Sequence, residues 1–263
     1  MPIELGKPAE YGQFILERRY KLAKAYAREA FARGGFYLDV GCGNGAQTVL
    51  FAKHFERWMA IDVEDGRLAE FRRELDRGSY EARTKPHEIV RYDGEHIPLE
   101  DNSVDVLTCI EVIEHTQSDA RTVRELFRVL APGGTAIITV PNKWWIFETH
   151  GANLPLLPWN RVPFFSWLPK RIHSKYAKAR IYRKAQIETL IRNAGFEIQR
   201  SVYVTAPMDM IRPARLQSFV RNSIFRNDET PIPILSTSIM IVATKPQSRI
   251  TLIVADYADE SRE

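Results

Sequence analysis

The chain has 263 residues, of which 44% are hydrophobic and 27% are charged, as in ordinary globular proteins. Its two cysteines, Cys42 and Cys109, exclude a disulfide-stapled scaffold and suit a reducing compartment. No apolar run approaches the ~20 residues of a membrane span, and the N-terminal MPIELGKPAE lacks a signal-peptide pattern. The sequence therefore predicts a cytoplasmic protein. The net charge of +4 is mild, so the distribution of charge is more informative than its size.

Short apolar segments alternate with amphipathic ones along the chain. The predicted strands are residues 36–40, 58–63, 87–93, 104–111, 135–142, 197–204 and 234–244. The predicted helices are residues 11–33, 46–55, a charged stretch ending near residue 75, residues 119–130 and residues 184–196. This alternation predicts an α/β fold with a doubly wound, mostly parallel sheet. The last two strands have no helix between them, so one of them is expected to run antiparallel.

Two segments are too long to be simple connections and are interpreted as an inserted cap. We expect a single domain over residues 1–263, and a further edge strand at 251–255 is considered. The expected parts are a helical segment at 1–35, the core at 36–142, cap insertions at 143–183 and 205–232, and a tail at 247–263.

The stretch LDVGCGNG places Gly41, Gly43 and Gly45 directly after the first strand. Glycines at this point of an α/β sheet permit positive φ and let a ligand approach the backbone. The pattern Gly41-x-Gly43-x-x-Ala46 also fits a dinucleotide fingerprint. The glycines alone therefore leave two cofactor classes open, one with a pyrophosphate and one with an ammonium group near this loop.

Three acidic positions favour one of these classes. Asp62 ends the second strand, where a carboxylate can accept both ribose hydroxyls of either cofactor. Asp39 precedes the first glycine, where a carboxylate would attract an ammonium group and repel a pyrophosphate. Asp93 and Gly94 close the third strand, in position to read an adenine edge.

The segments LDVGCGNG, AIDV, YDGEHIPLEDNSVDVLTCIEVIEH and LFRVLAPGG resemble successive motifs of class I S-adenosylmethionine-dependent methyltransferases. The similarity is greatest to the subgroup of ubiquinone and menaquinone biosynthesis. It implies a seven-stranded Rossmann-like sheet of order 3-2-1-4-5-7-6 with the seventh strand antiparallel. It also implies that S-adenosylmethionine is the cofactor, with Asp39 and residues 41–45 at its methionine end, Asp62 at the ribose, and Asp93 and Gly94 at the adenine. The implied cofactor-binding residues are Asp39, Gly41, Cys42, Gly43, Asn44, Gly45, Asp62, Val63, Asp93, Gly94 and Ile110.

His115 in EVIEH is the candidate catalytic base, because this loop faces the substrate in the family and imidazole titrates near neutral pH. A structural role, capping or orienting the loop, is the alternative. Glu111, Glu114 and His115 could also bind a divalent cation, as a similar cluster does in some relatives. That site would need a further ligand, for which His150 and His173 are the candidates, and we assign no metal.

The first insertion combines aromatic and basic residues, and no acidic residue occurs between positions 149 and 187. Its aromatics are Trp144, Trp145, Phe147, Trp159, Phe164, Phe165 and Trp167, and its cations are Arg161, Lys170, Arg171, Lys175, Lys178, Arg180, Arg183 and Lys184. The second insertion adds Arg212, Arg215, Arg221 and Arg226. Such composition suits a lid over an apolar acceptor or peripheral docking on an anionic membrane. A cap with its own small core is the alternative, while prolines disfavour a nucleic-acid stacking platform.

These observations predict methyl transfer to a small-molecule acceptor that is apolar, of isoprenoid or quinone type. Two alternatives stay open: a sugar or other hydroxylated acceptor, and a non-catalytic module that only binds S-adenosylmethionine.

Overall fold

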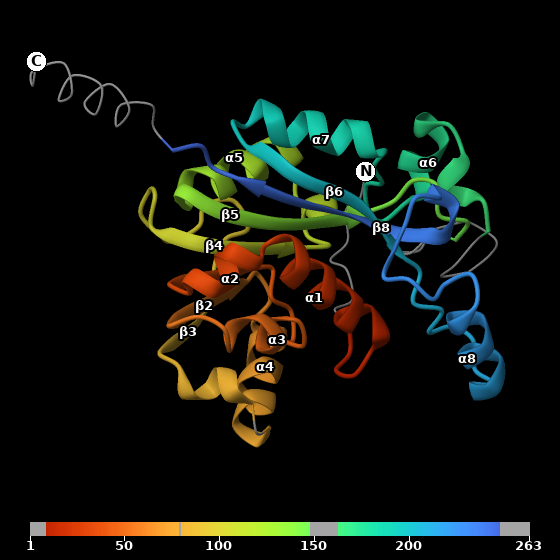
Figure 1. Ribbon diagram of the computed structural model, residues 1–263. Helices are drawn as coiled ribbons and strands as arrows, with labels where there is room; N and C mark the ends of the chain where they lie inside the picture. Colours follow the sequence, from red (N-terminus) through yellow and green to blue (C-terminus); the bar gives the residue numbers. More distant parts are fainter. Residues whose placement is uncertain (1–8, 79, 148–162, 248–263) are drawn as a thin grey trace, which may run out of the picture.

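The computed structural model describes residues 9–78, 80–147 and 163–247. The described residues form one eight-stranded sheet of order β3-β2-β1-β4-β5-β8-β6-β7 (Figure 1). The strands are β1 (Phe36–Val40), β2 (Arg57–Asp62), β3 (His87–Arg91), β4 (Val104–Ile110), β5 (Leu130–Pro141), β6 (Glu197–Thr205), β7 (Glu229–Thr230) and β8 (Ser236–Thr244).

The predicted strand order is confirmed. The last strand of the described residues, β8, lies between β5 and β6 and runs antiparallel to both, while β1 to β5 pair in parallel. Seven strands were predicted, whereas the described residues contain eight. The additional strand, β7, has two residues and pairs antiparallel with Tyr203 and Val204 of β6. A two-residue strand carries no hydrophobic periodicity, so no pattern could indicate it.

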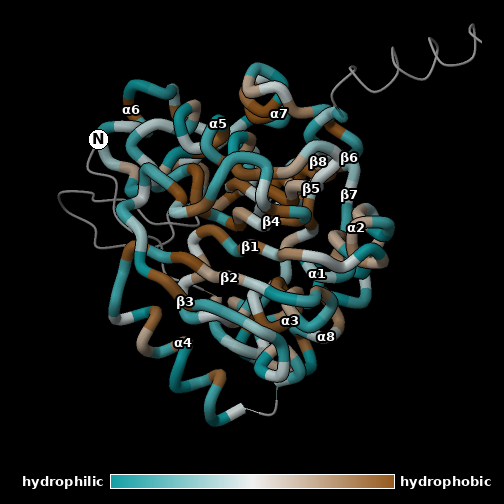
Figure 2. The backbone as a smooth tube through the Cα atoms, turned by 90° about the vertical axis from the view of Figure 1, so that its left-hand side faces the viewer, coloured by the Kyte–Doolittle hydropathy of each residue, from teal (hydrophilic) through white to brown (hydrophobic). Residues whose placement is uncertain are grey.

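Helices cover both faces of the sheet, with α5 and α7 on one face and α1 to α4 on the other (Figure 1). The sheet separates two hydrophobic cores, and alternate residues of β1 belong to different ones. Tyr37 lies in one core with Phe51, and Leu38 lies in the other with Leu126. Hydrophobic residues concentrate on the central strands (Figure 2). The helices are α1 (Phe14–Tyr26), α2 (Arg28–Arg33), α3 (Thr48–Ala52), α4 (Asp65–Arg77), α5 (Asp119–Val129), α6 (Lys170–Tyr176), α7 (Lys184–Asn193) and α8 (Ala214–Asn222).

Three boundaries differ from the sequence prediction. The N-terminal helix is broken into α1 and α2 at Ala27, whose φ of −110° and ψ of 30° leave the helical region. The helix after the glycines is only five residues long. Strand β5 starts at Leu130, which pairs with Val104 of β4, and Gly133 and Gly134 pair with Lys245 beyond the end of β8 instead of forming a free turn. The considered strand at 251–255 lies outside the described residues.

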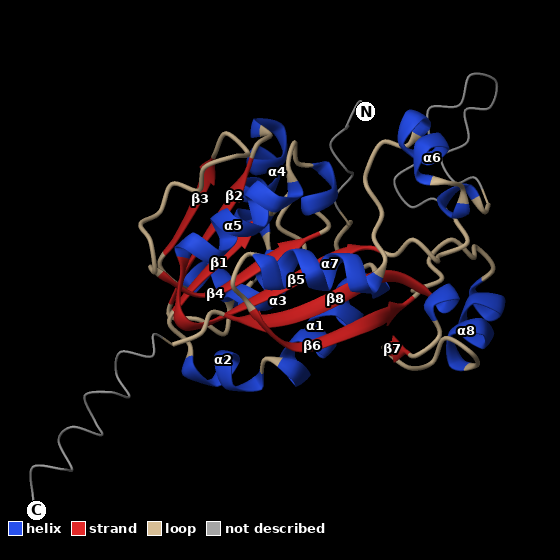
Figure 3. Cartoon of the chain, turned by 90° about the horizontal axis from the view of Figure 1, so that it is seen from above, coloured by secondary structure: helices blue, strands red, loops and turns tan. Residues whose placement is uncertain are grey.

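Two inserted segments emerge at one end of the sheet, where α6 and α8 lie (Figure 3). The first contains the short helix η3 (Phe165–Trp167) and α6, and the second contains α8 and β7. Phe165 is buried with Ala177 in a small cluster of its own, against which Leu168 and Tyr176 pack. None of the helices in the described ranges is long and apolar enough to cross a membrane.

Candidate active site

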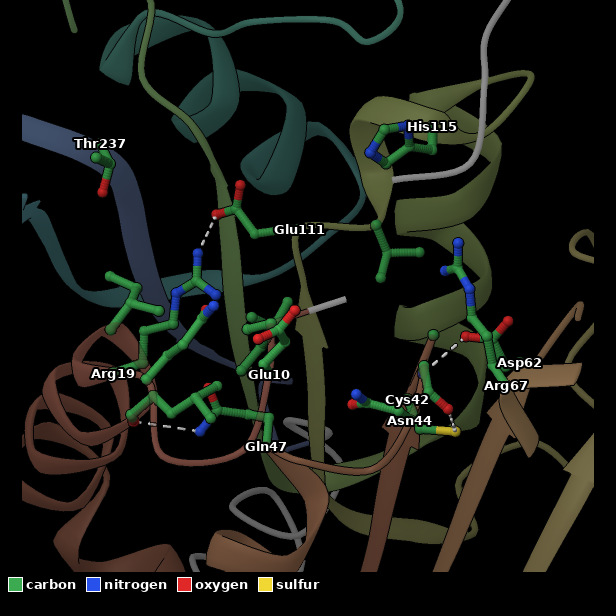
Figure 4. Close-up of a pocket in the computed structure, with 18 of the residues that line it drawn as sticks. Glu10, Arg19, Cys42, Asn44, Gln47, Asp62, Arg67, Glu111, His115 and Thr237 are labelled. Atoms are coloured by element: carbon green, nitrogen blue, oxygen red, sulfur yellow. Dashed lines mark hydrogen bonds and ion pairs between the residues drawn. The ribbon is translucent and has the colours of Figure 1, made fainter. Parts of the chain in front are cut away.

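A cavity of about 840 Å³ opens where β1, β2 and β4 end, at the edge where α/β sheets bind their ligands. Its volume lies within the range of small-molecule sites, ~300–1,000 Å³. The predicted residues on its wall are Asp39, Gly41, Cys42, Gly43, Asn44, Asp62, Val63, Gly94, Ile110 and His115. Gly45 and Asp93 are predicted site residues that do not line it. Figure 4 shows Cys42, Asn44 and Asp62 on one side of the cavity, with Arg19 and Glu111 on the other.

Protein contacts explain two of the three glycines. Gly41 has a φ of +74°, and a Cβ built there would lie 2.3 Å from Cγ2 of Val112. Gly45 has a φ of +80°, and its Cβ would lie 2.1 Å from the ring of Phe71. At these two positions contacts within the protein already exclude a side chain, whether or not a ligand is bound. The loop is held against β2, because the N–H groups of Gly41 and Cys42 both donate to the carbonyl of Ile61.

Asp62 is oriented by the backbone of two loops. Its Oδ2 accepts from the N–H of Gly43 at 2.8 Å, and its Oδ1 accepts from the N–H of Glu64 at 3.1 Å. The residue is 4% exposed and lines the cavity. A carboxylate oxygen can accept two hydrogen bonds, so both oxygens of Asp62 can still accept from hydroxyl groups.

Asp39 is part of a buried chain of hydroxyl groups. Its carboxylate accepts from Oγ1 of Thr48 at 2.5 Å and from Oγ1 of Thr108 at 2.7 Å, and the Thr108 hydroxyl contacts that of Tyr37. Burial raises the pKa of Asp39 to about 6, although both threonine hydroxyls oppose that shift. A nearby cation would favour the ionised form.

Asp93 is exposed and caps the turn after β3. Its Oδ1 accepts from the N–H groups of Glu95 and His96, both at 2.7 Å, and these bonds lower the pKa of Asp93. The neighbouring Tyr92 and Gly94 lie on the cavity wall. The contact of Asp93 that the structure shows is with its own turn.

An ion pair between Arg19 and Glu111 lies at the opposite end of the cavity (Figure 4). A guanidinium nitrogen of Arg19 is 3.0 Å from Oε1 of Glu111, which also accepts from the hydroxyl of Thr139 at 3.0 Å. Glu111 has a φ of +56°, a strained conformation of the kind that clusters at functional sites. Sequence reasoning missed Arg19, although its place between Ile15 and Leu22 on a buried helix face is a signal for a functional cation.

The loop that carries His115 is held by a residue from the first insertion. The guanidinium of Arg180 donates to the carbonyls of Thr116 and Gln117. Arg180 was grouped among the basic residues of the cap, and here it fixes the loop after β4. The His115 side chain is 7% exposed and faces the cavity. Burial, together with the charge of Glu111, raises the pKa of the adjacent Glu114 well above its ordinary value.

The cluster considered for a metal is arranged differently. The described residues contain no group of three or more His, Cys, Asp or Glu side chains placed to hold a metal ion. The cation at Glu111 is the guanidinium of Arg19, and His173 lies against the ring of Phe165 on the cap. His150 lies outside the described residues. We therefore derive no step through a metal.

Both insertions contribute apolar side chains to the wall. Trp145 and Phe147 come from the first insertion, and Met208 and Met210 come from the second. The rings of Trp145 and Phe147 pack edge to face, with their centroids 5.8 Å apart. The aromatics predicted to act together are divided: Phe165 is buried, whereas Phe164 and Trp167 are exposed and contact each other. Trp159 and Arg161 lie outside the described residues.

Comparison with known proteins agrees with this geometry. The family model described as a methyltransferase domain matches residues 38–138. A Mycolicibacterium smegmatis protein named "Probable S-adenosylmethionine-dependent methyltransferase" is 30% identical over 167 residues, which are 64% of this chain and 54% of that protein. A "Ubiquinone biosynthesis O-methyltransferase" from Saccharophagus degradans is 29% identical over 171 residues, which are 64% of this chain and 66% of that protein.

The fold is also similar to solved structures. An S-adenosylmethionine-dependent methyltransferase from Mesorhizobium loti matches with a TM-score of 0.57 and 16% identity, covering 85% of this chain and 98% of that chain. The alignment with the mycobacterial relative spans about half of that protein's length. Together with the strand order, these matches show that residues 38–138 belong to a methyltransferase domain with an α/β Rossmann-like fold.

Proposed function

We propose that the protein transfers a methyl group from S-adenosylmethionine to a hydroxyl group on a small apolar acceptor. The observation that carries this proposal is that one cavity joins two chemically different ends. Its donor end has the glycine loop and Asp62, and its acceptor end has the Arg19–Glu111 pair, while Trp145 and Phe147 add apolar surface to the wall. The name of the Saccharophagus relative supports an oxygen acceptor of quinone type.

At the donor end, the residues present fit S-adenosylmethionine, which supplies an electrophilic methyl group on a sulfonium sulfur. Asp62 has lone pairs that could accept from the ribose hydroxyls, and Asp39 would place a carboxylate near the methionine end. Val63, Gly94 and Ile110 would enclose the adenosine, while Cys42 and Asn44 would border the amino-acid end.

At the acceptor end, the chain must align a hydroxyl and remove its proton. The acceptor oxygen forms the new bond to the methyl carbon as the carbon–sulfur bond breaks. We assign removal of the hydroxyl proton to His115 and orientation of the acceptor to the Arg19–Glu111 pair. We further propose that the described parts of the insertions 143–183 and 205–232 form a cap that excludes water from the site. The same ion pair would also suit a hydroxyl-rich acceptor such as a sugar, which is the second candidate.

The test uses S-adenosylmethionine labelled in its methyl group, incubated with lipid and aqueous cell extracts. We expect label to enter the lipid-soluble fraction with wild type and not with Asp62→Ala. Label confined to the aqueous fraction would favour the sugar-like acceptor. If the protein binds the cofactor but label enters neither fraction, the catalytic proposal is contradicted. The alternative of a non-catalytic module that binds S-adenosylmethionine would then be favoured.

A further inference from the structure

The helix α8 presents an apolar face that the described chain does not cover. None of its nine residues is buried. Leu216 is 50% exposed and Phe219 is 71% exposed, and a spacing of three places both on one side of the helix. Ile224, just beyond the helix, is 69% exposed. Large side chains gathered in this way indicate an interaction site.

Exposed cations lie close to this face in the sequence, without acidic residues between them. Arg212, Arg215 and Arg226 are exposed, and the sequence from 210 to 227 contains no Asp or Glu. The remaining cation, Arg221, is used internally, because it pairs with Asp209 and lies over the ring of Phe14. The α8 surface therefore consists of Leu216, Phe219, Ile224, Arg212, Arg215 and Arg226.

The α8 surface adjoins the cavity. Met210 lines the cavity and is also 38% exposed, so it lies at the rim, and α8 begins four residues later. In Figure 3, α8 lies at the end of the molecule beyond the strands. A molecule held against α8 would thus be next to the entrance of the site.

We propose that the α8 surface docks on an anionic lipid bilayer. A short amphipathic helix with exposed Leu and Phe, flanked by arginines, matches a surface that offers acyl chains beneath negative headgroups. A second copy of the chain would bring the same arginines together and is disfavoured by repulsion. This inference concerns binding and does not rest on the proposed methyl transfer, so either can fail alone. If both hold, the bilayer delivers the apolar acceptor to the rim at Met210.

The experiment is co-sedimentation of the full chain with vesicles of phosphatidylcholine, with and without phosphatidylglycerol. We expect binding to the anionic vesicles in about 25 mM salt and release in about 500 mM salt, because salt screens the arginines. Leu216→Ser/Phe219→Ser/Ile224→Ser should weaken binding about tenfold or more, and so should Arg212→Gln/Arg215→Gln/Arg226→Gln. The charge-matched control changes the exposed Arg28, Arg73 and Arg77 of α2 and α4 to Gln and should bind as wild type.

The substituted side chains are exposed, so the variants should keep wild-type circular dichroism and affinity for S-adenosylhomocysteine. Equal binding to neutral vesicles, or loss of binding in the control, would overturn the proposal. It would also be overturned if the serine variant bound like wild type. If wild type ignores vesicles and runs as a dimer that the serine variant abolishes, the α8 surface is instead an interface between copies.

Discussion

The two ends of the cavity are held together in different ways. At the donor end, Asp62 is fixed by backbone N–H groups, and the glycine loop is fixed by the carbonyl of Ile61. At the acceptor end, Arg19 comes from the N-terminal helix, Glu111 from the end of β4, and the apolar wall from two insertions. The donor end is therefore held largely by hydrogen bonds to backbone groups, and the acceptor end by side chains that come from distant segments. A fold arranged in this way can keep its cofactor site while the acceptor site changes.

The largest expected effect is at the glycine loop. Gly41→Ala places a Cβ against Val112 at positive φ, and we expect it to lower the free energy of unfolding by roughly 2–5 kcal/mol. Urea unfolding measures this. Gly66→Ala is the matched control, because its helical Cβ would meet only Glu64 at 3.8 Å. That variant should be as stable as wild type or about 1 kcal/mol more stable. Equal stability of Gly41→Ala and wild type would show that the loop tolerates a side chain.

The second prediction compares Asp62 with Asp93, two of the three carboxylates that the sequence assigns to the cofactor. Asp62→Ala should weaken binding of S-adenosylhomocysteine by roughly 2–4 kcal/mol, because buried polar groups lose their partner. Asp93→Ala should change affinity much less, because Asp93 is exposed and absent from the cavity wall. Calorimetry on both variants distinguishes them. The reverse order would place the adenosine nearer to Asp93 than the cavity suggests.

Turnover tests the acceptor end. His115→Ala should lower the rate of methyl transfer about a hundredfold while leaving the affinity for S-adenosylhomocysteine unchanged. The assay is initial rate at saturating donor, with calorimetry as the control. A rate near that of wild type would show that His115 does not remove the proton. Catalysis would then come from the alignment of donor and acceptor alone.

Substitution of Arg19 tests whether the charge of Glu111 is neutralised by the guanidinium or by a metal ion. We expect a chelator to leave wild-type activity unchanged, because the guanidinium holds Glu111. Arg19→Ala should lose about tenfold in kcat/KM and should bind Mn²⁺ more tightly than wild type, since the carboxylate then has no cation. Paramagnetic resonance of Mn²⁺ measures the binding. If a chelator abolished the activity of the wild-type protein and a divalent cation restored it, this role of Arg19 would be contradicted.

The smallest effect is expected from pH. Because the pKa of Asp39 in the free protein is about 6, the carboxylate is protonated below that pH and must ionise to meet an ammonium group. Affinity for S-adenosylhomocysteine should therefore fall by up to about tenfold from pH 7.5 to about pH 5. Asp39→Asn should bind more weakly at pH 7.5 and show a flatter profile. A wild-type profile that is already flat would mean that Asp39 does not meet the ligand's charge.

The fold could be predicted because its determinants are periodic along the chain. The alternation of strands and helices gives the sheet, and the adjacent ends of β1 and β2 bring Asp62 to the glycine loop. Contacts between distant segments could not be predicted. The pairing of Arg19 with Glu111 depends on how α1 packs, and the clash at Gly45 depends on the ring of Phe71 in α4. The hydrogen bonds from Thr48 and Thr108 to Asp39 likewise join separate elements.

We propose that the cavity binds S-adenosylmethionine at the end formed by the glycine loop and Asp62. Isothermal titration of the wild-type protein with S-adenosylhomocysteine tests this binding directly. We expect saturable binding at one site per chain, abolished or strongly weakened in Asp62→Ala. Absence of binding at about millimolar ligand, with the protein folded, would contradict it.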